Sequence, residues 1–200
     1  MTAERLRYVA LGDSYTVGTA VAPAESFPSQ LVRVEPRLEL VANLGVNGYS
    51  TVDLIRDELP AFTRLEPGFA SLLVGANDVV QGIEPPAYEA NVRKVLDAIA
   101  ARLPAERVVI VSVPDYTVTP SGGDYGDPVE RSAGLRARNA SMAAVAAERG
   151  IAFVDVYDLS LEAATDPSLV ADDDLHPSGA QYTRWVERIA PVVASLLDGA

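Results

Sequence analysis

A histidine, an aspartate and a serine in this chain could together activate a hydroxyl group for nucleophilic attack. His176 is the only histidine in the sequence, and it lies in the acidic segment Asp-Asp-Leu-His-Pro at 173–177. Histidine is the usual proton shuttle of proteins because its ordinary pKa lies nearest neutral pH. Asp173 precedes it by three residues, so a short turn would let this carboxylate hold one ring nitrogen and leave the other free. A lone histidine on an acidic loop is more often a surface residue, but a serine elsewhere in the chain favours the catalytic interpretation.

That serine is Ser14, in the segment Gly-Asp-Ser-Tyr at 12–15, which follows a short apolar run. A serine hydroxyl attacks an ester when a neutral imidazole takes its proton and a carboxylate fixes the imidazole's tautomer. The attack places negative charge on the ester oxygen, and donors must already point there. Gly48 offers a backbone N–H and Asn77 a side-chain amide, and the backbone amide of Ser14 is a third candidate.

Each of these signals has a structural explanation when it is taken alone. The segment 12–15 could be a simple turn into a helix, and the glycines of 43–48 could serve only a loop that needs positive φ. The segment 75–78 could be an Asx turn. Gly-Val-Asn-Gly at 45–48 lacks the first glycine of a dinucleotide fingerprint and follows the second predicted strand, so no nucleotide cofactor is expected. The catalytic interpretation depends on all the signals occurring in order, each near a strand end or the last helix.

The elements that must position these residues alternate between strands and helices. Short apolar runs predict strands over 8–11, 38–43, 70–74, 108–113 and 151–156, and amphipathic patterns predict helices over 27–34, 51–65, 88–103, 128–149 and 178–197. Apolar strands of this kind suit a parallel sheet that is buried on both faces. The alternation predicts an α/β three-layer fold with right-handed crossovers. Ligands bind at the carboxyl ends of the strands in such sheets, which is where Ser14, 43–48 and 75–78 fall.

Local signals predict how several elements begin and end. Pro60 should break or bend the helix over 51–65. Gly150 is a candidate cap for the long alanine-rich helix, and Ser178 a candidate N-cap for the last one. The stretch 114–127 is irregular and glycine-rich, so it is either a substrate-contacting lid or a disordered connector.

Composition and charge exclude several classes of function. The 200 residues are expected to form a single domain over 1–200. A net charge of −12 weighs against nucleic acid as a partner and against attraction to an anionic membrane. No stretch reaches the roughly twenty apolar residues of a membrane span. The amino terminus shows no apolar stretch of signal-peptide type, so a cytoplasmic location is expected, or a secreted one if a leader was removed.

No metal or cofactor is expected either. The chain has no cysteine, which excludes disulfides and thiolate metal sites, and its single histidine leaves no histidine cluster. Asp172, Asp173 and Asp174 adjoin, but three consecutive aspartates cannot all point the same way to bind a cation. The lone Trp185 lies in the last predicted helix and is expected to pack there rather than to form a binding platform.

Taken together, the segments resemble the sequence blocks of the SGNH hydrolases, also called the GDSL esterase/lipase family. The segment 12–15 resembles the first block, with tyrosine where leucine is more usual. The segments 43–48, 75–78 and 173–177 resemble the second, third and last blocks, so the resemblance spans most of the chain. It implies a flavodoxin-like α/β/α sandwich around a five-stranded parallel sheet.

The resemblance also implies roles for individual residues. Ser14 would be the nucleophile, His176 the general base and Asp173 the residue that orients it, while the Ser14 amide, Gly48 and Asn77 would form the oxyanion hole. Asp172 and Asp174 also lie near His176, and it is the family spacing that selects Asp173.

The predicted function is that of a serine esterase acting on small-molecule carboxylic esters through an acyl-enzyme, with small acyl, acetyl, lipid or thioester substrates all open. A carbohydrate O-acetyl esterase or a lysophospholipase of the same family is an alternative. A more distant one is a non-catalytic ligand-binding module on a flavodoxin-like scaffold. The sequence does not predict an oligomeric state.

Overall fold

Five parallel strands form one sheet in the computed structural model, which describes residues 5–199. Their spatial order is β2-β1-β3-β4-β5, the flavodoxin-like arrangement. The strands are β1 (Leu6–Gly12), β2 (Leu38–Asn43), β3 (Phe69–Leu73), β4 (Val108–Val111) and β5 (Ala152–Val154). The predicted α/β fold class and five-stranded parallel sheet are thus confirmed. Residues 1–4 and residue 200 lie outside the described residues. Residues 1–4 belong to the amino-terminal stretch from which a cytoplasmic location is expected.

The sheet is covered on both faces because its central strands are apolar at nearly every position. Side chains alternate between the two faces of a strand. In β1, Tyr8 and Ala10 therefore pack into the core on one face, while Val9 and Leu11 pack into the core on the other. All four side chains are fully buried, as the near-continuous apolar run requires.

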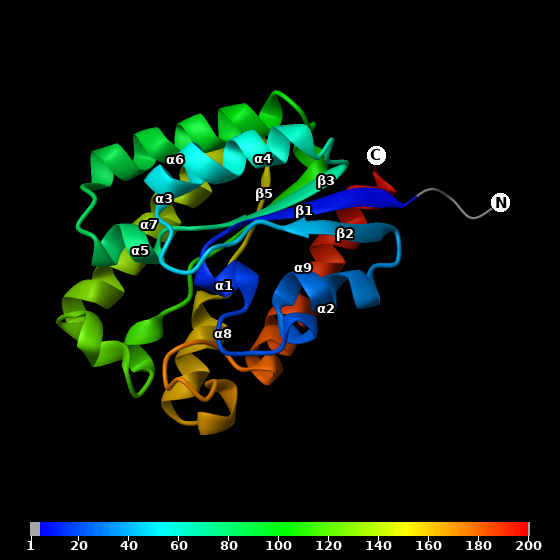
Figure 1. Cartoon of the computed structure of the whole chain (residues 1–200). Helices are drawn as coiled ribbons and strands as arrows, with labels where there is room; N and C mark the ends of the chain where they lie inside the picture. Colours follow the sequence, from blue (N-terminus) through cyan, green and yellow to red (C-terminus); the bar gives the residue numbers. More distant parts are fainter. Residues whose placement is uncertain (1–4, 200) are drawn as a thin grey trace.

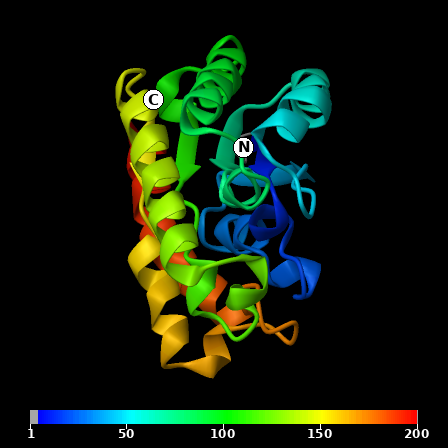
Figure 2. The same ribbon diagram turned by 90° about the vertical axis from the view of Figure 1, so that its left-hand side faces the viewer.

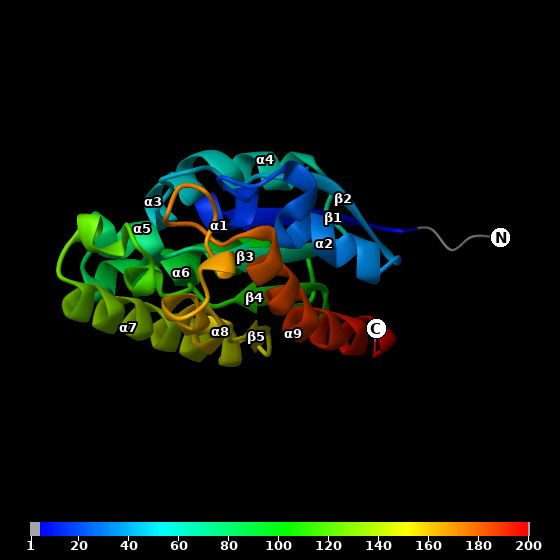
Figure 3. The same cartoon turned by 90° about the horizontal axis from the view of Figure 1, so that it is seen from below.

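Two layers of helices enclose the sheet (Figure 1). Helices α2 (Phe27–Val34) and α9 (Gly179–Asp198) cover one face, where Phe27 packs on Tyr182 and Trp185. The two helices lie side by side when the molecule is seen from below (Figure 3). The buried position of Trp185 agrees with its predicted packing role. The other face is covered by α4 (Leu59–Arg64), α6 (Pro85–Ala100) and α7 (Pro128–Ala147).

Within the described residues, 3-10 turns and four further α-helices connect these elements; the helices are α1 (Ser14–Val17), α3 (Thr51–Asp53), α5 (Ala76–Val80) and α8 (Tyr157–Leu161). Three of them, α1, α3 and α5, gather at the edge toward which β1 runs, on the left in Figure 1. That edge faces the viewer in Figure 2. Within residues 5–199, no helix combines the length and the apolar character that a membrane crossing demands.

The prediction of a single helix over 51–65 is wrong in one respect. A π-helical turn, Leu54–Glu58, separates α3 from α4, and the Leu59 amide bonds to the Leu54 carbonyl five residues back. Pro60 lies in the first turn of α4. A proline ring clashes with the carbonyl four residues earlier, and a wider turn before it relieves that clash. The predicted disturbance at Pro60 thus occurs as a π-turn that ends at Glu58.

Other boundaries differ by a few residues. β4 and β5 are shorter than predicted because their pairing ends at Val111 and Val154. Gly150 caps α7 as predicted: its φ is +66°, and the amides of Ile151 and Gly150 donate to the carbonyls of Ala146 at 3.0 Å and Ala147 at 3.1 Å. The predicted N-cap at Ser178 is confirmed, since its hydroxyl accepts a hydrogen bond from the Gln181 amide at 3.3 Å.

Candidate active site

Ser14 is the first residue of α1, in a tight turn at the carboxyl end of β1. The turn is held by Asp13, whose Oδ1 accepts a hydrogen bond from the Tyr15 amide at 3.0 Å. Gly12 has a φ of +148°, and a Cβ there would lie 2.0 Å from the Leu73 carbonyl oxygen. Glycine is therefore required at position 12, because the backbone of β1 passes against the end of β3. The local sequence thus fixes where the Ser14 hydroxyl emerges from the sheet.

His176 and Asp173 form a close pair on the loop before α9. The His176 Nδ1 lies 2.5 Å from the Asp173 Oδ2. The other oxygen of Asp173 accepts the backbone amides of His176 at 2.9 Å and Leu175 at 3.1 Å. Partial burial works against ionisation of Asp173, but these hydrogen bonds outweigh it and hold the pKa of Asp173 below its usual range. The carboxylate is therefore charged at neutral pH and fixes the orientation of the imidazole.

The neighbouring aspartates lie elsewhere. Asp172 and Asp174 line a separate surface hollow beside the segment 118–120, whereas only Asp173 bonds to the His176 ring. Within residues 5–199, no three acidic or histidine side chains are grouped so that they could hold a metal ion.

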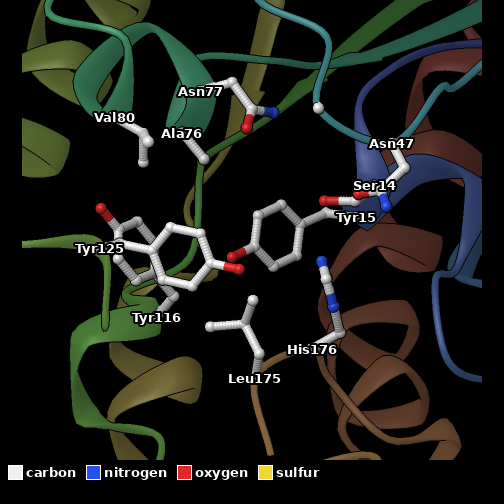
Figure 4. A pocket seen from close by; sticks show the side chains of 11 residues that line it. Ser14, Tyr15, Asn47, Ala76, Asn77, Val80, Tyr116, Tyr125, Leu175 and His176 are labelled. Atoms are coloured by element: carbon white, nitrogen blue, oxygen red, sulfur yellow. The ribbon is translucent and has the colours of Figure 1, made fainter. Parts of the chain in front are cut away.

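Ser14 and His176 face one cavity of about 190 Å³. Figure 4 shows the Ser14 hydroxyl and a ring nitrogen of His176 directed into the same space. No direct hydrogen bond joins these two side chains among the described residues, and both line the cavity. Asp173 does not line the cavity and lies behind the imidazole. The cavity is lined by Ser14, Tyr15, Asn47, Gly48, Ala76, Asn77, Val80, Tyr116, Tyr125, Leu175 and His176.

Donors for a developing negative charge lie at the same cavity. The Asn77 side-chain amide donates one hydrogen to the Tyr49 carbonyl at 2.9 Å, which leaves its second N–H free. Gly48 has a φ of +83°, and the Gln81 side chain holds its carbonyl at 3.0 Å. Within the described part of the chain, neither the Ser14 nor the Gly48 backbone N–H has a hydrogen-bond acceptor. Three donors predicted from the sequence therefore come together around one space.

Two buried carboxyl groups lie behind the turn that carries Ser14. Glu58, at the end of the π-turn, accepts the Gly12 amide at 2.9 Å through Oε2. Its Oε1 and the Oδ2 of Asp13 are buried and have no partner among residues 5–199. Burial raises the pKa of Glu58 to about 9 and the pKa of Asp13 to about 8. Both groups are therefore neutral at pH 7, and they support the backbone on either side of Ser14 without placing charge beneath it.

Several cavity residues were not among those selected from the sequence. Asn47 was included only as part of 43–48, and Tyr15 only as part of the first block. The Tyr15 ring packs against the His176 ring with their centroids 5.5 Å apart. The segment 114–127 contributes Tyr116 and Tyr125, which favours its interpretation as a substrate-contacting segment. The tyrosines among the glycines of this segment are the sequence signal that could have identified it as part of the site. Glu58 gave no sequence signal.

Comparison with known proteins finds a matching family. The model of the GDSL-like lipase/acylhydrolase family matches residues 10–184, which is most of the chain. No curated protein sequence matches the chain.

Solved structures show the same fold at low sequence identity. An alpha/beta hydrolase enzyme from the metagenome of Lake Arreo, Spain, has a TM-score of 0.75 at 20% identity, with 97% of each chain covered. A lipolytic protein of the G-D-S-L family from Veillonella parvula has a TM-score of 0.75 at 19% identity, covering 94% of this chain and 98% of its own. A catalytic mutant of an acetylxylan esterase from Geobacillus stearothermophilus has a TM-score of 0.73 at 19% identity, with 96% of each chain covered.

Proposed function

Since this chain belongs to the GDSL-like lipase/acylhydrolase family, we propose that it is a serine esterase that cleaves carboxylic esters through an acyl-enzyme on Ser14. One observation carries the proposal. Ser14 and His176 face a common cavity, and Asp173 engages the far ring nitrogen of His176 at 2.5 Å. A carboxylate on Nδ1 keeps the proton there and leaves Nε2 able to accept the serine proton.

In the acylation step, the Ser14 Oγ forms a bond to the carbonyl carbon of the ester while its proton passes to His176. The carbonyl oxygen becomes an oxyanion, and the N–H groups of Ser14, Gly48 and Asn77 are the donors available to it. The bond to the alcohol oxygen then breaks, and His176 returns the proton to the departing alcohol. The products of this step are a free alcohol and an ester of Ser14.

Deacylation repeats the sequence with water in place of serine. A water molecule loses its proton to His176 and attacks the acyl carbon, and the Ser14 oxygen leaves and takes that proton back. Ester and water are thus converted to acid and alcohol, with no redox change and no cofactor. Because the chain holds one histidine, no other imidazole can carry out either transfer.

A binding module for an anionic ligand fits the cavity less well. Among the described residues that line it, none is lysine or arginine. Carbohydrate O-acetyl esters and lysophospholipids are alternative substrates within the esterase proposal, and a panel of such esters distinguishes them. The likeness to an acetylxylan esterase carries no weight on this question, because at 19% identity it shows the fold alone.

The proposal is tested by hydrolysis of p-nitrophenyl butyrate. Ser14→Ala should reduce turnover to background while the thermal unfolding midpoint stays within a few degrees of the parent protein. Ser195→Ala, at an exposed serine on α9, is the matched control and should keep full activity. Undiminished turnover in Ser14→Ala would refute the nucleophile.

A further inference from the structure

The cavity has two unlike sides. Tyr116 is only 4% exposed and, with Leu175 and Ala76, presents apolar surface on one side. The other side carries Asn47, whose side chain is exposed and lies next to Ser14 in Figure 4. Tyr125, which is 40% exposed, packs edge-on against the Tyr116 ring with their centroids 5.8 Å apart.

We propose that Tyr116 and Tyr125 close the acyl side of the site and restrict the acyl group to a short chain, an inference that rests on the proposed function. The order of the reaction decides which side holds the acyl group. The alcohol must leave first and be replaced by water, so it occupies the open side near Asn47. The acyl group stays bonded to Ser14 through deacylation, so the closed side suits it.

The cavity is small for a ligand site. Its volume is about 190 Å³, whereas sites for drug-sized ligands measure about 300 Å³ or more. The ester group itself takes part of this space, so a long acyl chain meets the two tyrosine rings.

Tyr116 and Tyr125 together form what we call the tyrosine wall. Hydrogen bonds hold the segment that carries this wall in place. Asp115, next to Tyr116, is buried and accepts the hydroxyls of Ser132 at 2.6 Å, Thr117 at 2.7 Å and Tyr157 at 2.5 Å. These donors come from α7, from α8 and from the segment itself, so the wall is tied to two helices.

A further hydrogen bond holds the middle of the segment. The Ser121 amide donates to the Asp174 carbonyl at 2.9 Å, which joins the wall to the loop that carries His176. A Cβ at Gly122 would lie 2.3 Å from the Tyr116 carbonyl oxygen, so the chain passes closely over the wall here. The size limit is therefore built into the resting fold.

The test compares kcat/KM for p-nitrophenyl acetate, butyrate and octanoate. The wild-type protein should prefer acetate and butyrate to octanoate by a hundredfold or more. Tyr125→Ala opens the wall. Because Tyr125 is 40% exposed, we expect this variant to stay folded. Each newly buried methylene is worth about fourfold, so burial of two of the four extra methylenes of octanoate should raise the octanoate-to-butyrate ratio by about sixteenfold in this variant. Val129→Ala, at a 77% exposed residue just beyond the segment, should leave the ratio unchanged.

A pair of substitutions at Tyr116 gives an independent check. The Tyr116 hydroxyl has no hydrogen-bond partner within residues 5–199, so Tyr116→Phe keeps the wall and should keep the selectivity. Tyr116→Ala removes the wall and should raise the octanoate-to-butyrate ratio, with circular dichroism to verify folding. Equal wild-type rates on butyrate and octanoate, or a Tyr125→Ala variant that changes both rates alike, would overturn this inference and leave the esterase proposal standing. Failure to hydrolyse all three esters would overturn both.

Discussion

The buried carboxyl group of Glu58 makes the stability of the fold depend on pH in an unusual direction. Burial raises the pKa of Glu58 from 4.5 to about 9. Between these values the unfolded chain has released the proton and the folded chain retains it. The folded state thus binds more protons, and the free energy of unfolding falls as pH rises. This contribution is fully present below about pH 4 and is lost as pH rises through the folded-state pKa.

Glu58→Gln removes this dependence with little change in shape. A glutamine oxygen can still accept the Gly12 amide that Glu58 binds at 2.9 Å, and glutamine is neutral at every pH. One proton difference changes the free energy of unfolding by about 1.4 kcal/mol per pH unit. Between pH 5 and pH 8, Glu58→Gln should therefore gain about 4 kcal/mol relative to the wild type. Part of the wild-type slope should remain, because burial also raises the pKa of Asp13 to about 8.

Urea unfolding at several values from pH 5 to pH 8 measures this difference directly. Glu39→Gln, at an exposed glutamate on β2, is the matched control and should follow the wild-type profile. Parallel profiles for Glu58→Gln and the wild type would refute the reasoning, because they would mean that Glu58 ionises in the folded protein as readily as in the unfolded chain.

Two further predictions concern the catalytic step. Asn77→Ala removes a side-chain donor and should lower kcat for p-nitrophenyl butyrate by about a hundredfold or more, whereas the control Ser195→Ala, on the exposed face of α9, should have no effect. Asn77→Ala also removes the hydrogen bond to the Tyr49 carbonyl, so its unfolding midpoint should fall by about a few degrees. Equal rates in both variants would remove Asn77 from the oxyanion site. Asp173→Asn replaces the acceptor on the His176 Nδ1 with an amide that can hold the wrong tautomer, so kcat should fall by about a thousandfold or more. A kcat within tenfold of wild type would show that Asp173 does not set the state of the imidazole.

Much of the fold could be predicted because the strands carry strong local signals. The short apolar runs at β1 and β4 predict buried strands. The strand β2 has the predicted bounds, Leu38–Asn43. The alternation of elements then restricts the topology to a doubly covered parallel sheet. Such a sheet brings the segments after β1 and β3 to one edge, so the meeting of Ser14 and Asn77 follows from the order of elements. The single-domain organisation over 1–200 stays a prediction.

What could not be predicted depends on contacts between distant segments. Glu58 is buried because the π-turn before Pro60 brings it under Gly12, and neither the turn width nor that contact is encoded locally. Tyr116 and Tyr125 reach the cavity because Asp115 is bound by hydroxyls from two helices that follow later in the chain. The choice of Asp173 over its neighbours came from the family spacing, because an acidic run has no periodicity that would single it out.

The covalent step on Ser14 is the claim on which the proposed function depends, and a fluorophosphonate probe tests it most directly. Intact-protein mass spectrometry after incubation should show one phosphonyl adduct, and peptide mapping should locate it on Ser14. The adduct should be absent from Ser14→Ala and present in Ser195→Ala. An adduct that forms equally fast in Ser14→Ala, or ester hydrolysis by a wild-type protein that the probe never modifies, would contradict the account.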